Sequence, residues 1–360
     1  MILYVWRYNE TTAHYEKTSV IDSATSIIWV TRFNSVGQFE LYMPMSRDNY
    51  RLFYDYMHDV LITRDDSDAV MIVDDLRVTT DPDNGDYLTV TGTDGGGILA
   101  RRIIPEQTNF TGTAENFIRT LIEQNIINPD DTRRKISMFT LDTANGWTDE
   151  IERQVTGKNL LDTICDICAY YVYGFKVTFD GQNFKFSLYK GTDHSQNQNE
   201  NSLVIFSPGY ENIQSTTFIF GKSGFKTAVY VAGEGQGSDR IINLAQYAGE
   251  DTGMWRREMW EDSRNTSQTT DSGQIPLADY KQMLYNQGVE TLRQNIYQWE
   301  FNAECINTDM YKYGVDYGLG DKVTAINQYR IGANATVSEI TEVEDAEGYR
   351  LIPTFSDWSV

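Results

Sequence analysis

The C-terminal part of the chain carries the pattern that most restricts the fold, a run of short strands that cannot be stable alone. Between Tyr313 and Phe355, apolar and polar residues alternate in β-rich segments that tight turns separate. The clearest segments are Lys322–Ile326, Ala335–Val343 and Tyr349–Phe355. A meander of this size buries too little apolar surface to fold by itself. We therefore expect it to close a barrel or to lie on another sheet.

Strand patterns elsewhere in the chain supply the partners that this meander needs. Residues 1–105 hold regularly spaced strands, among them the pair Ser26–Phe33 and Gly37–Met43, and predict a first β-barrel. Strands return in residues 202–247 and, after an interruption, in residues 298–360. Together these two stretches predict a second β-barrel of similar size.

Two segments of different character interrupt the strands. Residues 106–201 predict an α+β insert domain, with one helix that begins after Thr113 and another at Asn159–Tyr171. Residues 248–297 predict a polar arm and a helix that starts at Pro276. The predicted fold class is therefore a β-rich α+β protein: two β-barrel domains with an α+β insert domain and a helical insert.

The formal net charge of −22 argues against two classes of partner. A nucleic-acid grip needs clustered Lys and Arg to displace counterions, and binding to an anionic membrane surface needs a basic face. One interpretation of the excess carboxylates is solubility by self-repulsion. The other is an anionic surface along which DNA passes without sticking. Both interpretations stay open.

Cysteine, histidine and glycine patterns predict no metal and no cofactor. Cys165 and Cys168 lie three residues apart inside the apolar pattern of Asn159–Tyr171, so both are expected to pack in the core. Cys305 stands apart, and the three histidines are too far apart in sequence for a zinc motif. The glycines of Gly233–Gly237 are followed by a strand pattern, whereas a dinucleotide site requires a helix there.

No targeting or membrane segment is expected. Met1–Trp6 is apolar but only six residues long, and it predicts a first strand. No apolar run approaches the ~20 residues that a membrane helix needs. We expect a soluble protein that is made in a reducing cytoplasm.

Several short motifs, taken in order along nearly the whole chain, resemble one family. They are SIIWVTRF at 26–33 with GQFEL at 37–41, LARRII at 99–104, VIFSP at 204–208, VAGEG at 231–235, RRE at 256–258 with Asp262, GDKV at 320–323, ITEV at 340–343 and PTF at 353–355. Together they resemble the siphophage tail-hub proteins, also called baseplate-hub or tail-associated proteins. These proteins are similar to the hub protein of contractile phage tails.

The resemblance implies an assembly function without catalysis. In such proteins two barrel hub domains per chain form a homotrimer with a pseudo-sixfold ring, which adapts the sixfold tail tube or the distal tail ring to a threefold tip. The resemblance implies a place in the virion, at the phage tail tip, after synthesis in the bacterial cytoplasm. DNA would pass through the lumen without sequence-specific binding, and we expect carboxylates to line that bore.

The implied partners are the distal tail protein, the tape measure protein and tail fibre or receptor-binding proteins. Many relatives also carry a C-terminal peptidase, lysin or fibre domain, whereas this chain ends at Val360, just after its last strand. We therefore expect a piercing or cleaving activity to lie on another chain, unless the sequence is a truncated piece.

The expected interface residues are charged or aromatic side chains around residue 258 and one turn near the C-terminus: Trp255, Arg256, Arg257, Glu258, Trp260, Asp262, Gly320 and Asp321. An arginine pair in an acidic chain suits contacts to carboxylates, so we expect Arg256 or Arg257 to pair with an acid within the chain or across the trimer. Glu258 and Asp262 are not spaced as helical partners of Arg257, which favours a distant partner. The tryptophans are expected to anchor subunit contacts.

Two alternative functions stay open. A cell-wall hydrolase needs two carboxylates roughly 5–10 Å apart. The chain has three adjacent pairs, Asp74-Asp75, Asp130-Asp131 and Glu261-Asp262, but neighbours on a strand point to opposite faces, so adjacency alone makes no acid–base couple. A glycan-binding module would use exposed rings, for which Trp255, Trp260 and Trp358 are the candidates.

Overall fold

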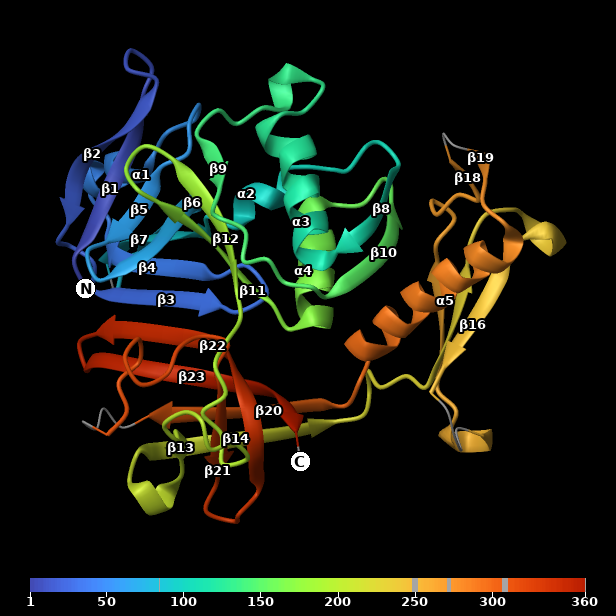
Figure 1. Ribbon diagram of the computed structural model, residues 1–360. Coiled ribbons are helices and arrows are strands. Elements are labelled where there is room, and N and C mark those ends of the chain that lie inside the picture. The colour runs from blue at the N-terminus through green and yellow to red at the C-terminus, as the bar shows by residue number, and fades with distance from the viewer. Residues whose placement is uncertain (84, 248–251, 271–272, 306–309, 360) are drawn as a thin grey trace.

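The computed structural model describes residues 1–83, 85–247, 252–270, 273–305 and 310–359. Its largest feature is a 16-stranded sheet that joins the two ends of the chain (Figure 1). The central path of the sheet follows the order β14-β20-β23-β22-β3-β4-β7-β6, and every neighbouring pair on it is antiparallel. The bounds are β14 Ile213–Gly221, β20 Gln298–Cys305, β23 Gly348–Ser359, β22 Gly332–Asp345, β3 Ser26–Arg32, β4 Gln38–Pro44, β7 Gly85–Asp94 and β6 Ser67–Asp81.

The predicted C-terminal meander is confirmed, and it lies on the sheet of the N-terminal half. One edge of the long strand β22 has two partners in succession. Residues 332–336 pair with β21 (Lys322–Ile326), and residues 339–344 pair with β3. The other edge of β22 pairs with β23. This single strand therefore joins the first and last parts of the chain.

The N-terminal half completes its part of the sheet with three further strands and one helix. They are β1 (Leu3–Asn9), β2 (His14–Ile21), β5 (Leu61–Arg64) and α1 (Arg47–Phe53). β5 pairs with β1 on one edge and with the first part of β6 on the other. Alternation drives this packing: in β4 the side chains of Phe39, Leu41 and Met43 are buried and those between them are not.

The C-terminal half has its own core beneath β20, β22 and β23. The short strand β13 (Ile205–Phe206) runs parallel to β21. Phe206 lies 5.1 Å from Phe355, and Phe355 lies 6.1 Å from Phe301, measured between ring centroids. All three rings are buried, which fixes this half as a packed unit.

The predicted α+β insert packs on β5 and β6. Its elements are α2 (Gly97–Ala100), β8 (Thr108–Thr113), α3 (Ala114–Ile122), a π-helical turn at Glu123–Ile127, a 3-10 turn at Thr132–Arg134, β9 (Phe139–Leu141), β10 (Glu150–Val155), α4 (Leu160–Tyr171), β11 (Gly174–Phe179) and β12 (Phe184–Tyr189). Thr113 Oγ1 accepts from Asn116 N at 3.3 Å, and Asn159 Oδ1 accepts from Leu161 N at 2.9 Å. Both predicted helix starts are therefore confirmed as capped N-termini.

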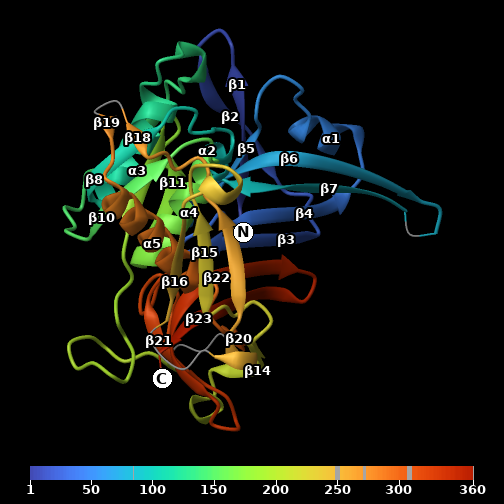
Figure 2. The same ribbon diagram turned by 90° about the vertical axis from the view of Figure 1, so that its right-hand side faces the viewer.

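A lobe that we call the arm, residues 222–297, lies to the side of the body. It holds β15 (Ala228–Ala232), β16 (Ile242–Gln246), β17 (Glu258–Asp262), β18 (Thr269–Thr270), β19 (Gly273–Gln274) and α5 (Leu277–Gln294). The strands β16-β15-β17 form one sheet, and α5 covers one face of it, where Val229, Val231 and Leu284 are buried. Figures 1 and 2 show that the arm joins the body where β14 ends and β20 begins.

The β-rich class is confirmed, but two expectations differ from the structure. Among the described residues neither half forms a closed barrel, because the edge of β3 that could close the first one pairs with β22. The strands β15 and β16 lie in residues 202–247, which were assigned to the second barrel, but they pair with each other in the arm, where β15 also pairs with β17. The sequence of β17, EMWED, does not alternate strictly between apolar and charged residues, and this hid a strand parallel to β15. Within the described ranges, no helix combines the length and apolar content needed to cross a bilayer.

Candidate functional site

A seam between β3 and β22 joins the two halves, and a buried ion pair lies beneath it. Arg64, at the end of β5, donates to both carboxylate oxygens of Glu342, at 2.8 Å and 3.0 Å. Its guanidinium also lies over the Trp29 ring, 5.3 Å from the centroid. Burial alone would lower the pKa of Arg64, but hydrogen bonds to Asp66 and Glu342 raise it above its ordinary value. A guanidinium that stays charged, with two carboxylate partners, therefore lies beneath the seam.

Two strands of the sheet have an outer edge, or part of one, that pairs with no other described strand. β14 pairs with β20 alone, and the far part of β6, residues 75–80, pairs with β7 alone. Figure 2 shows the β6–β7 hairpin reaching beyond the rest of the sheet. A free strand edge is a template for pairing with another chain. These two edges are the first candidate assembly surfaces.

The face of the path that points away from the core is rich in hydroxyl groups and carries both signs of charge. Cross-strand partners on it include Thr91 with Glu40 and with Asp75. Arg32 of β3 donates to Glu339 of β22 across the seam at 2.6 Å. Further threonines on this face are Thr79, Thr89, Thr217, Thr341 and Thr354.

The predicted arginine pair lies at the start of β17 in the arm. Arg256 Nε donates to Glu258 Oε1 at 2.5 Å, so its acidic partner is local, whereas a distant partner was expected. This contact lowers the pKa of Glu258 and raises that of Arg256. Arg257 donates to the backbone oxygen of Lys222 at 2.7 Å and has no carboxylate partner among the described residues. The two neighbouring arginines therefore have different roles.

Asp262 and the two tryptophans lie on the exposed side of the arm. Asp262 accepts from Arg264 at 2.5 Å and also from Arg240, and these contacts hold its pKa well below the ordinary value. The Arg240 guanidinium lies 5.7 Å from the Trp260 ring centroid. Trp255 is 61% exposed and Trp260 53% exposed, so both rings are available for a contact. Trp358 has no described side chain.

Gly320 and Asp321 lie at the joint between the two halves and the insert. Asp321 accepts from Thr192 N and from Gly318 N, both at 2.6 Å. Gly320 has a φ of +92°, and a Cβ there would lie 2.3 Å from Cε2 of Phe33. These residues therefore fix a turn inside the protein and offer little surface to a neighbour.

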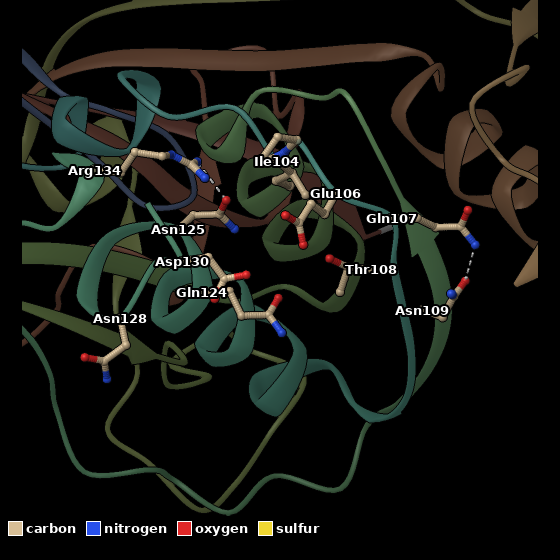
Figure 3. Close-up of a pocket in the computed structure, with 11 residues that line it drawn as sticks. Ile104, Glu106, Gln107, Thr108, Asn109, Gln124, Asn125, Asn128, Asp130 and Arg134 are labelled. Carbon is tan, nitrogen blue, oxygen red and sulfur yellow. Dashed lines mark hydrogen bonds between the residues drawn. The ribbon is translucent and has the colours of Figure 1, made fainter. Parts of the chain in front are cut away.

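A pocket of about 360 Å³ lies between the start of β8 and the end of α3 (Figure 3). Its lining is mostly amide and carboxylate groups and holds no His, Cys, Ser or Lys. Arg134 donates to Asn125 Oδ1 at 2.9 Å on one wall. The pocket can hydrogen-bond a polar group, but its lining does not supply a nucleophile with a neighbouring base.

The adjacent carboxylate pairs make no acid–base couple. Asp130 lines this pocket while Asp131 caps the next turn by accepting from Arg133 N at 3.1 Å. Glu261 accepts from Gln287 Nε2 at 2.7 Å on the helix side of β17, opposite Asp262. Within the described residues, no group of three His, Cys, Asp or Glu side chains is suited to a metal ion.

A second pocket, of about 450 Å³, lies beside β6 and the segment that follows α1. Its lining includes Tyr54, Tyr56, Met57, Asp74 and Leu76. Tyr56 is 83% exposed and Met57 62% exposed. Apolar side chains this exposed beside a free strand edge mark a possible contact surface.

The two cysteines of α4 pack as predicted. Cys168 is buried in the core of the insert, and Cys165 packs against that core. Burial raises the pKa of Cys165 to about 12 and that of Cys168 well above its ordinary value. Both thiols are therefore protonated and unreactive near neutral pH. Cys305 has no described side chain.

The Arg64–Glu342 pair and the free edges were not found by sequence reasoning. In β22 a bulge between Val337 and Glu339 shifts the alternation by one residue, so Glu342 follows Ile340 on the core side. A charged residue such as Glu342, at a strand position where the alternation places buried apolar residues, is the signal that could have revealed a buried ion pair.

One protein-family model matches this chain over nearly its whole length. The family model described as "Siphovirus ReqiPepy6 Gp37-like protein" matches residues 2–356, which confirms the resemblance to siphovirus proteins. Among curated protein sequences, no match reaches significance.

Solved structures with a similar fold are tail proteins. The tail protein from Neisseria meningitidis MC58 is 12% identical, with a TM-score of 0.56 over 99% of this chain and 96% of that chain. The 43 kDa tail protein of prophage MuSo2 from Shewanella oneidensis is 12% identical, with a TM-score of 0.52 over 98% and 97%. The prophage tail protein gp18 from Listeria monocytogenes EGD-e is 12% identical, with a TM-score of 0.50 over 99% and 94%. At this identity the likeness is one of fold.

Proposed function

Because the chain belongs to the Siphovirus ReqiPepy6 Gp37-like family, we propose that it is a structural protein of a bacteriophage tail tip. In this proposal three copies form a hub ring that adapts the tail tube or the distal tail ring to a threefold tip. The tail proteins of similar fold support the proposal, and so do the unpaired outer edges of β14 and of residues 75–80 in β6.

The observation that carries the proposal is the direction of the two end strands. The path from β14 to β6 contains an even number of strands and is antiparallel throughout, so β14 and β6 run in opposite directions. The free edge of β14 in one copy can therefore pair with the free edge of β6 in the next and keep the antiparallel pattern. A head-to-tail contact of this kind closes a ring when the rotation per copy is right.

The seam within the chain makes such a ring pseudo-sixfold. Each copy would contribute one internal joint, β3 with β22, and one joint to its neighbour, β6 with β14. Three copies then give six joints that alternate around the ring. The threonine-rich face would line the bore. Hydroxyls interspersed with both signs of charge would give DNA phosphates no continuous basic grip, and this proposed lining replaces the carboxylate-lined bore expected from the sequence.

The proposed partners are the distal tail protein above the ring, and the tape measure protein and tail fibre or receptor-binding proteins at the tip. The proposed location is the virion. A role in catalysis is not part of the proposal, and no acid–base couple stands in the described pockets to favour a cell-wall hydrolase.

The test is the oligomeric state together with the edges that form it. We expect mass photometry and electron microscopy of the purified protein to give rings with three times the mass of one chain. Arg77→Pro and Val78→Pro should then be compared, because neighbouring N–H groups of a strand point to opposite edges. The variant that keeps the wild-type melting temperature should lose the ring. A protein that stays monomeric at high concentration would overturn the proposal.

A further inference from the structure

An exposed cluster of aromatic and basic residues lies at the base of the arm, directly after β14. We call it the basic aromatic patch, and it consists of Phe220, Lys222, Phe225, Lys226 and Tyr297. Tyr297 stacks on Phe225 with ring centroids 3.9 Å apart and lies 5.7 Å from Phe220. Phe220 is nevertheless 44% exposed. A rigid ring cluster that stays half in water is typical of a protein contact surface.

The cations of this patch are unusual in so acidic a chain. Lys222 and Lys226 have no carboxylate within ion-pair distance among the described residues, and neither has the adjacent Arg257. The Lys222 ammonium lies 5.4 Å from the ring centroid of Phe220. The patch therefore presents uncompensated positive charge around apolar rings.

The pocket beside β6 has the opposite character, and we call it the acidic tyrosine pocket. Asp74, on its wall, accepts from Thr93 Oγ1 at 3.0 Å and makes no ion pair among the described residues, although Arg101, which pairs with Asp59 of the same pocket, lies within its electrostatic reach. Tyr56 and Met57 stand almost free of the protein around it. The pocket thus combines apolar surface with negative charge. The basic aromatic patch combines apolar surface with positive charge.

The two surfaces lie at matching ends of the two free edges. In an antiparallel pairing, the high-numbered end of β14 meets the low-numbered end of the free part of β6. Phe220 is at the first of these ends, and Asp74 and Leu76 are at the second. The pocket would therefore face the patch across the joint between two copies.

The apolar side chains of the two surfaces also lie on the same face of the sheet, whereas Asp74, at the bulge of β6, bonds to Thr93 on the opposite face. Phe220 is the register partner of Trp299, on the side where Phe218 meets the buried Phe301. Leu76 and Val78 are register partners of the buried Val90 and Leu88. Both sets therefore point to the core side. In a continued sheet Phe220 would lie near Val78, which is 46% exposed in the single chain.

We propose that the basic aromatic patch of one copy docks into the acidic tyrosine pocket of the next copy. The contact rests on the proposed ring and adds side-chain recognition to it. Pairing between strand edges uses backbone hydrogen bonds and does not depend on the side chains. Opposite charges at one end of the joint would select the β14 edge for the β6 edge and would set the register of their pairing.

Carbodiimide cross-linking tests the contact directly, because this reagent joins a lysine to a carboxylate only when they touch. We expect a cross-link between Lys222 and Asp74 in the assembled wild type. Mixing ¹⁵N-labelled with unlabelled protein should show that it joins two different chains.

Charge reversal gives a second readout on the same protein. Lys222→Glu should weaken association by about tenfold or more at low salt, with a smaller effect at high salt. Adding Asp74→Lys should restore most of the loss. Lys281→Glu, near the far end of α5, is the matched control and should leave association unchanged.

The outcomes separate this inference from the proposed function. If rings form but Lys222→Glu assembles as tightly as Lys281→Glu and no cross-link to Asp74 is found, the docking contact is overturned and the ring stands. If no ring forms under any condition, both are overturned. A Lys222–Asp74 cross-link within a single chain would also overturn the contact.

Discussion

Arg64 and Glu342 are 278 positions apart in sequence and form two hydrogen bonds, of 2.8 Å and 3.0 Å, beneath the seam between β3 and β22. Both side chains are buried, so the pair spans the two halves where water cannot replace either partner. Removing Glu342 leaves the buried guanidinium of Arg64 with Asp66, a largely exposed residue, as its remaining carboxylate partner.

Glu342→Gln should therefore lower the free energy of unfolding by about 1.5–3 kcal/mol, because Arg64 keeps its charge and its contact to Asp66 but loses the buried one of its two carboxylate partners. Urea unfolding monitored by tryptophan fluorescence measures this. The double variant Arg64→Met with Glu342→Leu should be less destabilised than Glu342→Gln, since no unpaired charge remains. A single variant within about 1 kcal/mol of the wild type would show that the pair does not hold the seam.

Gly320→Ala should destabilise the protein more than Gly348→Ala. Both glycines have positive φ, +92° and +112°, so each alanine costs about 1–2 kcal/mol in backbone strain. Only at Gly320 would the new methyl group also strike Phe33, which adds about 1–3 kcal/mol, whereas Gly348 has open space. Thermal unfolding of the two variants isolates the contact with the Phe33 ring. Equal melting temperatures would contradict it.

Glu115 should make the insert sensitive to acid. Burial alone would raise the pKa of Glu115, but the N–H groups of Asn145, Gly146 and Trp147 donate to its carboxylate and lower the pKa below the ordinary 4.5. Because the folded pKa is the lower one, this stability is present above pH 4.5 and is lost as the pH falls through the folded value.

The variant Glu115→Gln should remove that dependence. Its stability near pH 7 should fall below that of the wild type, and the difference should shrink on acidification. Denaturant unfolding at several pH values between 3 and 7 measures the two profiles. Parallel profiles would show that Glu115 does not titrate with unfolding.

Replacing Trp255 and Trp260 by Ser should leave the free energy of unfolding within about 0.5 kcal/mol, because both rings are more than half exposed. The same variant separates two roles for these rings. Loss of binding to isolated cell-wall glycan would favour the glycan-binding alternative, and loss of a contact between tail proteins would favour the subunit role. A large fall in stability would show that the rings support the arm itself.

Periodicity predicted local elements well where a strand or helix obeyed one pattern. The helices after Thr113 and Asn159 and the hairpin β11–β12 follow from capping residues and alternation. The helix α1 was missed although Ser46 caps it by accepting from Asn49 N at 2.9 Å, because its sequence has little apolar periodicity.

The arrangement of strands could not be predicted in the same way. Alternation states which face of a strand is buried and says nothing about its neighbour, so β15 and β16 were assigned to a barrel while they pair within the arm. The pairing of β3 with β22 lies over the buried Arg64–Glu342 pair, which a bulge hides from the sequence pattern. The exposed edges became visible only once every strand had its partners.

A molecule whose two ends fit each other has no built-in limit on length. In the proposed ring, whether copies close after three or continue as an open helical filament depends on the angle at each internal joint, where β3 pairs with β22 over the Arg64–Glu342 contact. In that proposal, loosening this joint while the outer edges stay intact would favour fibres over closed particles, so a contact deep in one chain would bear on the size of the whole assembly.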